Sequence, residues 1–137
     1  MIARMTSKSL MWLGVFVVGL VTTVWGGTNV ARAQGASSYQ LSCRGIGVSG
    51  ARLLAQCRRM DGSWADTSIH IRGINNINGV LQSDGTEQPS TFQLTCIHIH
   101  VAGDMLSAQC RRVDGSYQQT SIAIQGIANI NGMMRYQ

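Results

Sequence analysis

The chain is poor in charged residues, aromatic rings and proline. Of its 137 residues, 12% are charged and 6% are aromatic, and proline occurs once. So few charges provide little long-range attraction for phosphate, and so few aromatic rings leave only a small core. The four cysteines form no Cys-x-x-Cys pair, which disfavours zinc binding and thiol redox chemistry. These absences disfavour a nucleic-acid-binding protein, a zinc protein and a redox enzyme.

What is present begins with an N-terminal segment typical of exported proteins. Arg4 and Lys8 give it a positive start, and an apolar run covers residues 10–24. Ala31-Arg32-Ala33 then places small residues at the two positions that a signal peptidase reads. The fifteen apolar residues also approach the length of a short membrane anchor, which is the alternative interpretation. We expect a signal peptide over residues 1–33, cleaved after about Ala33, and a secreted or periplasmic protein.

Removing this segment takes away most of the net positive charge. Cleavage of 33 of the 137 residues leaves 104, with eight arginines against six acids, so the net charge falls from +5 to +2. A charge of this size offers little to nucleic acid. We expect no nucleic-acid partner and, after cleavage, no membrane partner. Residues 34–38 are expected to form a short tail before a domain at 39–137.

The remaining sequence is an internal duplication. Gln40-Leu-Ser-Cys43 returns as Gln93-Leu-Thr-Cys96, and every later motif returns at the same offset of 53 residues. Without a gap, 25 of 44 aligned positions are identical. Two copies are too few for a solenoid, so two pseudo-equivalent halves around an approximate twofold axis are expected. Repeat one covers residues 39–82, a linker 83–91, and repeat two 92–137.

Each copy has the pattern of a β protein. Asp61-Gly62 separates two runs of strand-forming residues, which is a strong hairpin signal. Residues 74–77 are expected to form a short helical turn, and Trp64 and Tyr117, at equivalent positions, are expected to anchor the core. The sequence therefore predicts an all-β fold with short helical turns.

The cysteines are expected to form disulfides, because the chain is small and carries an export signal. Four cysteines allow three pairings. Duplication favours one bridge within each copy, since each ancestral copy then had a complete bridge of its own. Each would close a loop of about 15 residues and contribute roughly 3 kcal/mol. The residues concerned are Cys43, Cys57, Cys96 and Cys110.

Catalytic and metal sites are not expected. His98 and His100 would share one face of a strand, but no third ligand accompanies them and no histidine recurs in the other copy. Asp84 and Glu87 are the only nearby pair of acids, whereas a glycosidase needs two carboxyl groups that face one bond. We therefore expect no enzyme activity, no cofactor and no metal.

The order of motifs, repeated twice, resembles the cyanovirin-N family of mannose-binding lectins. The motifs are an aromatic residue shortly before a cysteine, a second cysteine about fourteen residues on, a hairpin ending in Thr-Ser-Ile, and Asn-Ile-Asn-Gly. The resemblance implies an elongated, pseudo-symmetric pair of small β domains, each a triple-stranded sheet plus a hairpin with one disulfide. It also implies that the domains mix the repeats, one holding residues 39–73 and 127–137, the other 74–126.

The resemblance further implies non-catalytic recognition of high-mannose glycans, through terminal α1,2-linked mannose, at two sites. The partners would be mannose-rich oligosaccharides or glycoproteins, and the protein a monomer or a domain-swapped homodimer. Amide, hydroxyl and guanidinium groups suit adjacent sugar hydroxyls. One implied cluster, near the chain ends, comprises Ser42, Arg58, Asn129 and Asn131. The middle cluster, expected to be the better site, comprises Asn76, Asn78, Thr91, Thr95, Arg111 and Arg112.

The sequence also departs from the family pattern. Asn78 and Asn131 stand where the family often has Asp, Arg58 stands where an acid commonly follows the second cysteine, and residues 83–87 are an insertion. The alternative hypothesis is therefore a secreted structural or protein-interaction module that kept the fold but lost sugar binding.

Overall fold

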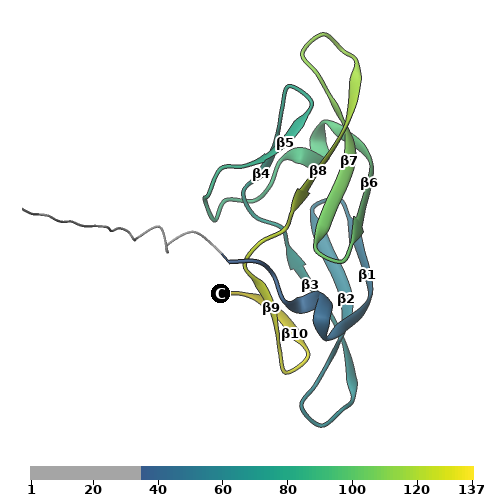
Figure 1. Ribbon diagram of the computed structural model, residues 1–137, viewed down its shortest axis with the longest axis vertical. Helices are drawn as coiled ribbons and strands as arrows, with labels where there is room; N and C mark the ends of the chain where they lie inside the picture. Colours follow the sequence, from purple (N-terminus) through teal and green to yellow (C-terminus); the bar gives the residue numbers. More distant parts are fainter. Residues whose placement is uncertain (1–34) are drawn as a thin grey trace, which may run out of the picture. The chain divides into compact units, whose positions relative to one another are not determined.

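The computed structural model describes residues 35–137, so the predicted signal peptide lies outside the described part (Figure 1). Within that part the chain forms strands and two single turns of 3-10 helix. In chain order they are η3 (Tyr39–Leu41), β1 (Cys43–Ser49), β2 (Arg52–Arg58), β3 (Trp64–His70), β4 (Ile74–Ile77), β5 (Val80–Ser83), η4 (Phe92–Leu94), β6 (Cys96–Ala102), β7 (Met105–Arg111), β8 (Tyr117–Ala123), β9 (Ile127–Ile130) and β10 (Met133–Tyr136). No helix of residues 35–137 has the length and apolar character needed to cross a membrane.

The strands form two equivalent sets, each an antiparallel three-stranded sheet and a hairpin. One set comprises the sheet β1-β2-β3 and the hairpin β4-β5, the other the sheet β6-β7-β8 and the hairpin β9-β10. The all-β prediction is confirmed, but the helical turn expected over residues 74–77 is wrong. Asn78 and Gly79 adopt φ values of 49° and 89°, which suit a tight hairpin turn, so Ile74–Ile77 is extended and pairs with β5.

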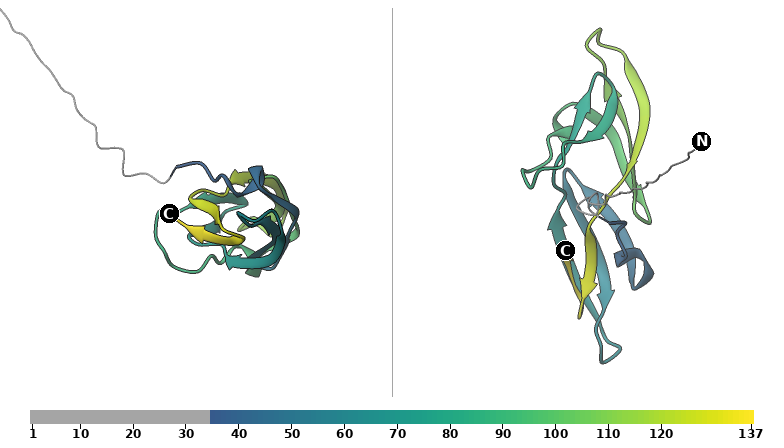
Figure 2. Two further views of the ribbon diagram at one scale, coloured as in Figure 1. Left: turned by 90° about the horizontal axis from the view of Figure 1, so that it is seen from below. Right: turned by 60° about the vertical axis from the view of Figure 1, so that its left-hand side comes forward.

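The hairpins exchange partners between the repeats. β5, from repeat one, contacts β8 of repeat two, and β10 of repeat two contacts β3 of repeat one. The Leu81 N–H donates to the Thr120 hydroxyl, and the Met134 N–H donates to the Thr67 hydroxyl, both at 3.1 Å. Each sheet is therefore completed by a hairpin from the other repeat, as the family resemblance implied (Figures 1 and 2).

The core includes the aromatic residue of each 3-10 turn and the disulfides. Tyr39 and Phe92 are fully buried at equivalent positions, and the Tyr39 hydroxyl donates to the Gly103 carbonyl at 2.6 Å. The bridges Cys43–Cys57 and Cys96–Cys110 each join two neighbouring strands of one repeat. This confirms the pairing within each copy.

The expectation that Trp64 and Tyr117 anchor the core is wrong. Their side chains are 36% and 48% exposed, because they begin β3 and β8 on the outward face, where every second residue meets solvent. The guanidinium of Arg44 lies 3.9 Å from the centre of the Trp64 ring.

The residues just before repeat one are part of the packed structure. Ser37 is buried, and its hydroxyl donates to the Ile124 carbonyl at 2.6 Å and accepts from the Ile127 N–H at 3.0 Å. Ser90, the equivalent residue in the linker, accepts from the Ile74 N–H at 2.9 Å. The start of each repeat is thus fixed to the hairpin strand that follows each sheet.

Candidate functional site

An asparagine holds together the polar residues of the middle cluster. The Asn76 amide donates to the Thr95 hydroxyl and to the Arg111 carbonyl, both at 2.9 Å, and its oxygen accepts from the Gly79 N–H at 2.8 Å. Three of the hydrogen bonds that this side chain can make are therefore internal. Asn76 organises the cluster rather than offering most of its own groups to a ligand.

The second asparagine of the motif attaches the hairpin β4-β5 to the turn that joins β7 and β8. Asn78 has a φ of 49°, and its side-chain oxygen accepts from the Val113 N–H at 2.9 Å. Asparagine tolerates this conformation better than most residues. Asn78 therefore stabilises the turn of its own hairpin and also holds the β7–β8 turn at the edge of the cluster.

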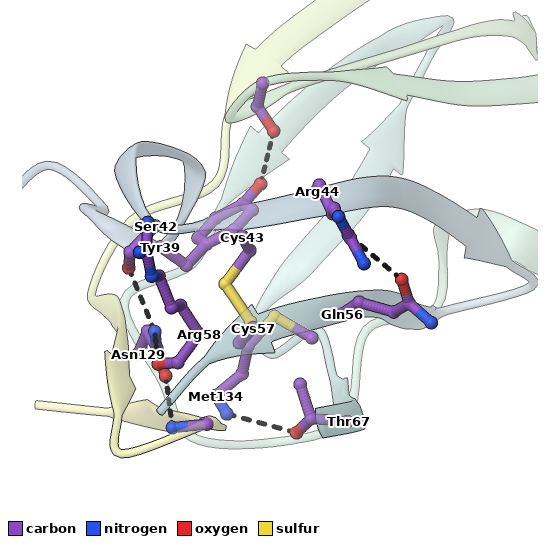
Figure 3. The surroundings of a disulfide bond; sticks show 12 residues. Tyr39, Ser42, Cys43, Arg44, Gln56, Cys57, Arg58, Thr67, Asn129 and Met134 are labelled. Atoms are coloured by element: carbon purple, nitrogen blue, oxygen red, sulfur yellow. Dashed lines mark hydrogen bonds between the residues drawn. A yellow bond between two sulfur atoms is a disulfide. The ribbon is translucent and has the colours of Figure 1, made fainter. Parts of the chain in front are cut away.

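The terminal cluster repeats these contacts at an offset of 53 residues. The Asn129 amide donates to the Ser42 hydroxyl at 3.0 Å and to the Arg58 carbonyl at 2.9 Å, and Asn131 accepts from the Met60 N–H at 2.9 Å. Figure 3 shows Asn129 facing Ser42 and Arg58 across the end of the sheet. The structure brings together all four residues of this cluster.

The disulfides position both clusters. Ser42 precedes Cys43 and Arg58 follows Cys57, so the bridge holds the two polar residues beside each other (Figure 3). The Arg58 N–H donates to the Ser42 carbonyl at 2.9 Å, and the Arg111 N–H donates to the Thr95 carbonyl at 3.0 Å beside the other bridge. Each bridge therefore supports a polar cluster as well as the fold.

A glycine lets an arginine lie across the turn of each hairpin. Gly79 has a φ of 89°, and a Cβ there would lie 2.7 Å from the Cγ of Arg112. The Arg112 guanidinium donates to the Gln118 side chain. Together with four neighbours these two residues line a shallow hollow beside the cluster. The hollow is lined by Asn78, Val80, Arg112, Val113, Asp114 and Gln118.

Thr91 lies apart from the other predicted residues of the middle cluster. Its hydroxyl donates to the Asn75 side chain at 2.6 Å, and Asn75 in turn donates to Asp84 at 2.9 Å. Asn75 and Asn76 are adjacent on a strand and point to opposite faces, so Thr91 contacts the face that does not carry the cluster.

Two residues of the sites were missed. Arg59 is the equivalent of Arg112, and a Cβ at Gly132 would lie 2.7 Å from its Cγ. Gln118 contacts Arg112 in the middle cluster, whereas the equivalent of Gln118 beside the terminal cluster is Ala65. The offset of 53 residues would have identified Arg59. Nothing in the local sequence distinguishes Gln118 from other polar strand residues.

The acids beside the clusters close turns and form no ion pair with the arginines of the clusters in residues 35–137. Asp114 accepts from the Ser116 hydroxyl at 2.6 Å and from the Ser116 N–H at 2.9 Å. These hydrogen bonds hold the pKa of Asp114 below its usual range, and those from Ser63 do the same for the pKa of Asp61. Each acid therefore stabilises a hairpin tip in its charged form.

The chemistry of the clusters favours hydrogen bonding over metal binding or acid–base catalysis. No three His, Cys, Asp or Glu side chains converge in the described part of the chain. What the clusters offer is guanidinium, hydroxyl and amide groups close together. Such groups are suited to a neutral ligand with several hydroxyls.

Comparisons with known proteins agree with this architecture. TbCVNH of T. borchii is 28% identical, with a TM-score of 0.62 over 73% of this chain and 99% of that chain. Microvirin, solved as a complex with mannobiose, is 27% identical, with a TM-score of 0.58 over 74% and 99%. A MoCVNH3 variant in complex with (N-GlcNAc)4 is 21% identical, with a TM-score of 0.62 over 75% and 99%, and shares the fold. No curated protein matches. Residues 39–135 match the family described as CVNH domain, and the chain belongs to this family of cyanovirin-N homologues.

Proposed function

We propose that this protein is a non-catalytic lectin that binds high-mannose glycans, through terminal α1,2-linked mannose, at two pseudo-equivalent sites. The observation that carries the proposal is the duplicated cluster, in which an internally hydrogen-bonded asparagine holds a hydroxyl and an arginine at the surface. Microvirin, at 27% identity, is solved with mannobiose, and this supports mannose as the sugar.

The groups left for a ligand are suited to vicinal hydroxyls. In the middle cluster, the Thr95 hydroxyl accepts one internal bond, the Asn78 amide nitrogen makes none among residues 35–137, and Arg111 is exposed. A sugar hydroxyl both donates and accepts, so it pairs with such a mixture of groups. An epimer with one hydroxyl misplaced leaves a polar group unpaired, which provides selectivity.

Two sites on one molecule favour branched glycans. The β2–β3 and β7–β8 turns, which border the terminal and middle clusters, point away from each other (Figure 1; Figure 2, right). Two arms of one glycan, or two neighbouring glycans, could occupy both sites. Binding of the second arm then benefits from a raised effective concentration.

The test is calorimetric titration of the oxidised, secreted chain with α1,2-mannobiose. We expect saturable binding with a stoichiometry of two, retention on a mannose-rich column and elution with free mannoside. A galactose disaccharide is the control and should give no heat beyond dilution. A tetramer of N-acetylglucosamine, as in the MoCVNH3 variant complex, is the comparison sugar.

Each other outcome contradicts a stated part of the proposal. Binding of the N-acetylglucosamine tetramer alone would replace mannose as the sugar. A stoichiometry of one would contradict the second site. A folded protein that binds none of these sugars would contradict the lectin function and support the interaction module.

We also propose that the chain is exported and loses residues 1–33. The positive start, the apolar run and the Ala31-Arg32-Ala33 motif support this, as do the two disulfides, which persist in oxidising compartments. Mass spectrometry of the protein outside the cytoplasm should find a chain that begins at about Gln34. An intact chain retained in the membrane would support the anchor instead.

A further inference from the structure

A cavity lies between the hairpin β4-β5 and the end of β8 with the residues that follow it. Its volume is about 160 Å³, and it is partly open to solvent. The side chains of Ile74, Ile122 and Ile124 give it apolar walls, and Ser83, Gln125 and Arg72 lie at its edge. None of these residues belongs to either polar cluster, so this cavity is separate from the proposed sugar sites.

The equivalent position in the other half is filled by a tyrosine. Ser83 ends β5 opposite Ile74, and Tyr136 ends β10 opposite Ile127 at an offset of 53 residues. The Tyr136 hydroxyl accepts from the Arg72 N–H at 2.9 Å, and the Arg72 guanidinium lies 4.3 Å from the centre of its ring. Burial raises the pKa of Tyr136, so the phenol is held in its neutral form.

Replacement of the tyrosine by serine leaves both a space and a hydrogen-bond donor. Gln125 is the equivalent of Arg72, and each forms an isolated β-bridge with a residue shortly before a 3-10 turn, Ala36 before η3 and Pro89 before η4. Among residues 35–137, the Gln125 N–H has no acceptor that corresponds to the Tyr136 hydroxyl. The cavity therefore has room for a phenol ring and borders the Gln125 N–H, which is free to donate to a hydroxyl, but the described part of the chain places no tyrosine there.

We propose that this cavity binds a compact, neutral phenol as a small-molecule ligand. An apolar protein cavity of about 150 Å³ accommodates benzene, so a single ring fits a cavity of about 160 Å³. The ring would contact the three isoleucines, and the hydroxyl would accept from the Gln125 N–H, as the Tyr136 hydroxyl accepts from Arg72. The Arg72 guanidinium already packs against the Tyr136 ring, so the ligand needs no negative charge to pair with it.

The test is an NMR titration of the oxidised protein, labelled at the isoleucine methyls, with p-cresol. We expect saturable shifts at Ile74, Ile122 and Ile124, and intermolecular nuclear Overhauser effects between these methyls and the ring protons. Toluene has the same ring without the hydroxyl and should bind about fivefold more weakly, the value of one hydrogen bond. Cyclohexanol tests whether the planar ring is needed.

Two substitutions of Ser83 test whether the ligand binds in this cavity. Ser83→Tyr would fill the cavity from within, so it should abolish the p-cresol shifts and raise the melting temperature. Ser83→Ala is the matched control and should keep binding. Equal binding by the folded Ser83→Tyr variant, equal affinity for toluene, or shifts in the unmodified protein that miss the three isoleucines would each overturn the proposal. If Ser83→Tyr does not fold, the nuclear Overhauser effects in the unmodified protein decide, and their absence overturns it.

Discussion

The two polar clusters have the same internal hydrogen bonds but differ at one neighbouring side chain. Asn76 and Asn129 each donate to a hydroxyl and to an arginine carbonyl. Beside these bonds, the middle cluster has Gln118 where the terminal cluster has Ala65. Duplication has preserved both the contacts that build the clusters and the groups left for a ligand, whereas the residue beside the second arginine has diverged.

This difference separates what builds a site from what sets its affinity. The internal contacts predict that both clusters fold equally well. The Gln118 side chain accepts from Arg112 and donates to the Gly79 carbonyl at 3.3 Å, so it positions this arginine beside the hollow and predicts that the middle site binds more tightly.

Loss of a disulfide should have the largest effect. Changing Cys96 and Cys110 to alanine should lower the free energy of unfolding by about 3 kcal/mol, because each bridge closes a loop of about 15 residues. It should also abolish sugar binding at the middle site, since the bridge holds Thr95 beside Arg111. Denaturant unfolding and NMR titration measure the two effects.

The matched variant removes Cys43 and Cys57. It should lose the terminal site and keep the middle one. Loss of both sites from either variant would contradict independent support of each cluster by its own bridge.

Loss of the organising asparagine should rank second. Asn76→Ala removes one acceptor and two donors, and should cost about 1–3 kcal/mol of stability together with middle-site binding. Asn129→Ala should cost the same and affect the terminal site. Asn75→Ala is the control, because among residues 35–137 the Asn75 side chain hydrogen-bonds to Thr91 and Asp84 and to no residue of the cluster that Asn76 organises.

The combined Arg111→Ala and Asn76→Ala variant should weaken sugar binding more than Arg58→Ala combined with Asn129→Ala, because the middle site is expected to be the better site.

Urea unfolding should give equal stability losses for the two single asparagine variants, Asn76→Ala and Asn129→Ala. Unequal losses would contradict the equivalence of the two sets of internal contacts.

Exchange of the divergent residue should have a smaller effect. Gln118→Ala removes the hydrogen bond that positions Arg112, so it should weaken the middle site about fivefold, and Ala65→Gln should strengthen the terminal site. Gln119→Ala, on the outward face of the same strand, should change neither. Unchanged affinity in Gln118→Ala, measured by site-resolved titration, would remove this residue from the explanation.

The smallest effect should be on pH dependence. Asp61 and Asp114 have a lowered pKa in the folded protein, so their contribution to stability is present above the ordinary value of 3.8 and is lost as the pH falls through the lower folded pKa. Asp114→Asn and Asp61→Asn should each flatten this loss, to the same extent. Thermal unfolding between pH 2 and pH 6 measures it, and a loss of stability at higher pH would contradict the assignment.

Much of the fold could be predicted from the sequence because duplicated motifs repeat local signals. Asp61-Gly62 predicts a hairpin, and one disulfide in each copy follows from symmetry. The extended conformation of residues 74–77 was not predicted, because the turn at Asn78-Gly79 selects a hairpin only when a partner strand follows it. Exposure of Trp64 was missed because alternation places it outward while Tyr39 fills the core.

The sites were predicted less completely than the fold. Asn76, Thr95 and Arg111 come together as the family pattern implied, because the disulfide and the hairpin turn fix them. Thr91 does not join them, and Arg59 and Gln118 were overlooked. Which face a strand residue presents depends on register and on the hairpin from the other repeat, and neither is a local property of the sequence.

The most direct test of the central claim is a site-resolved NMR titration with α1,2-mannobiose. The side-chain amides of Asn76 and Asn78 report the middle site, and those of Asn129 and Asn131 the terminal site. The structure predicts saturable shifts at both pairs, with the middle pair saturating at the lower sugar concentration. Saturation of the terminal pair first, or no shift at either pair in a folded protein, would contradict it.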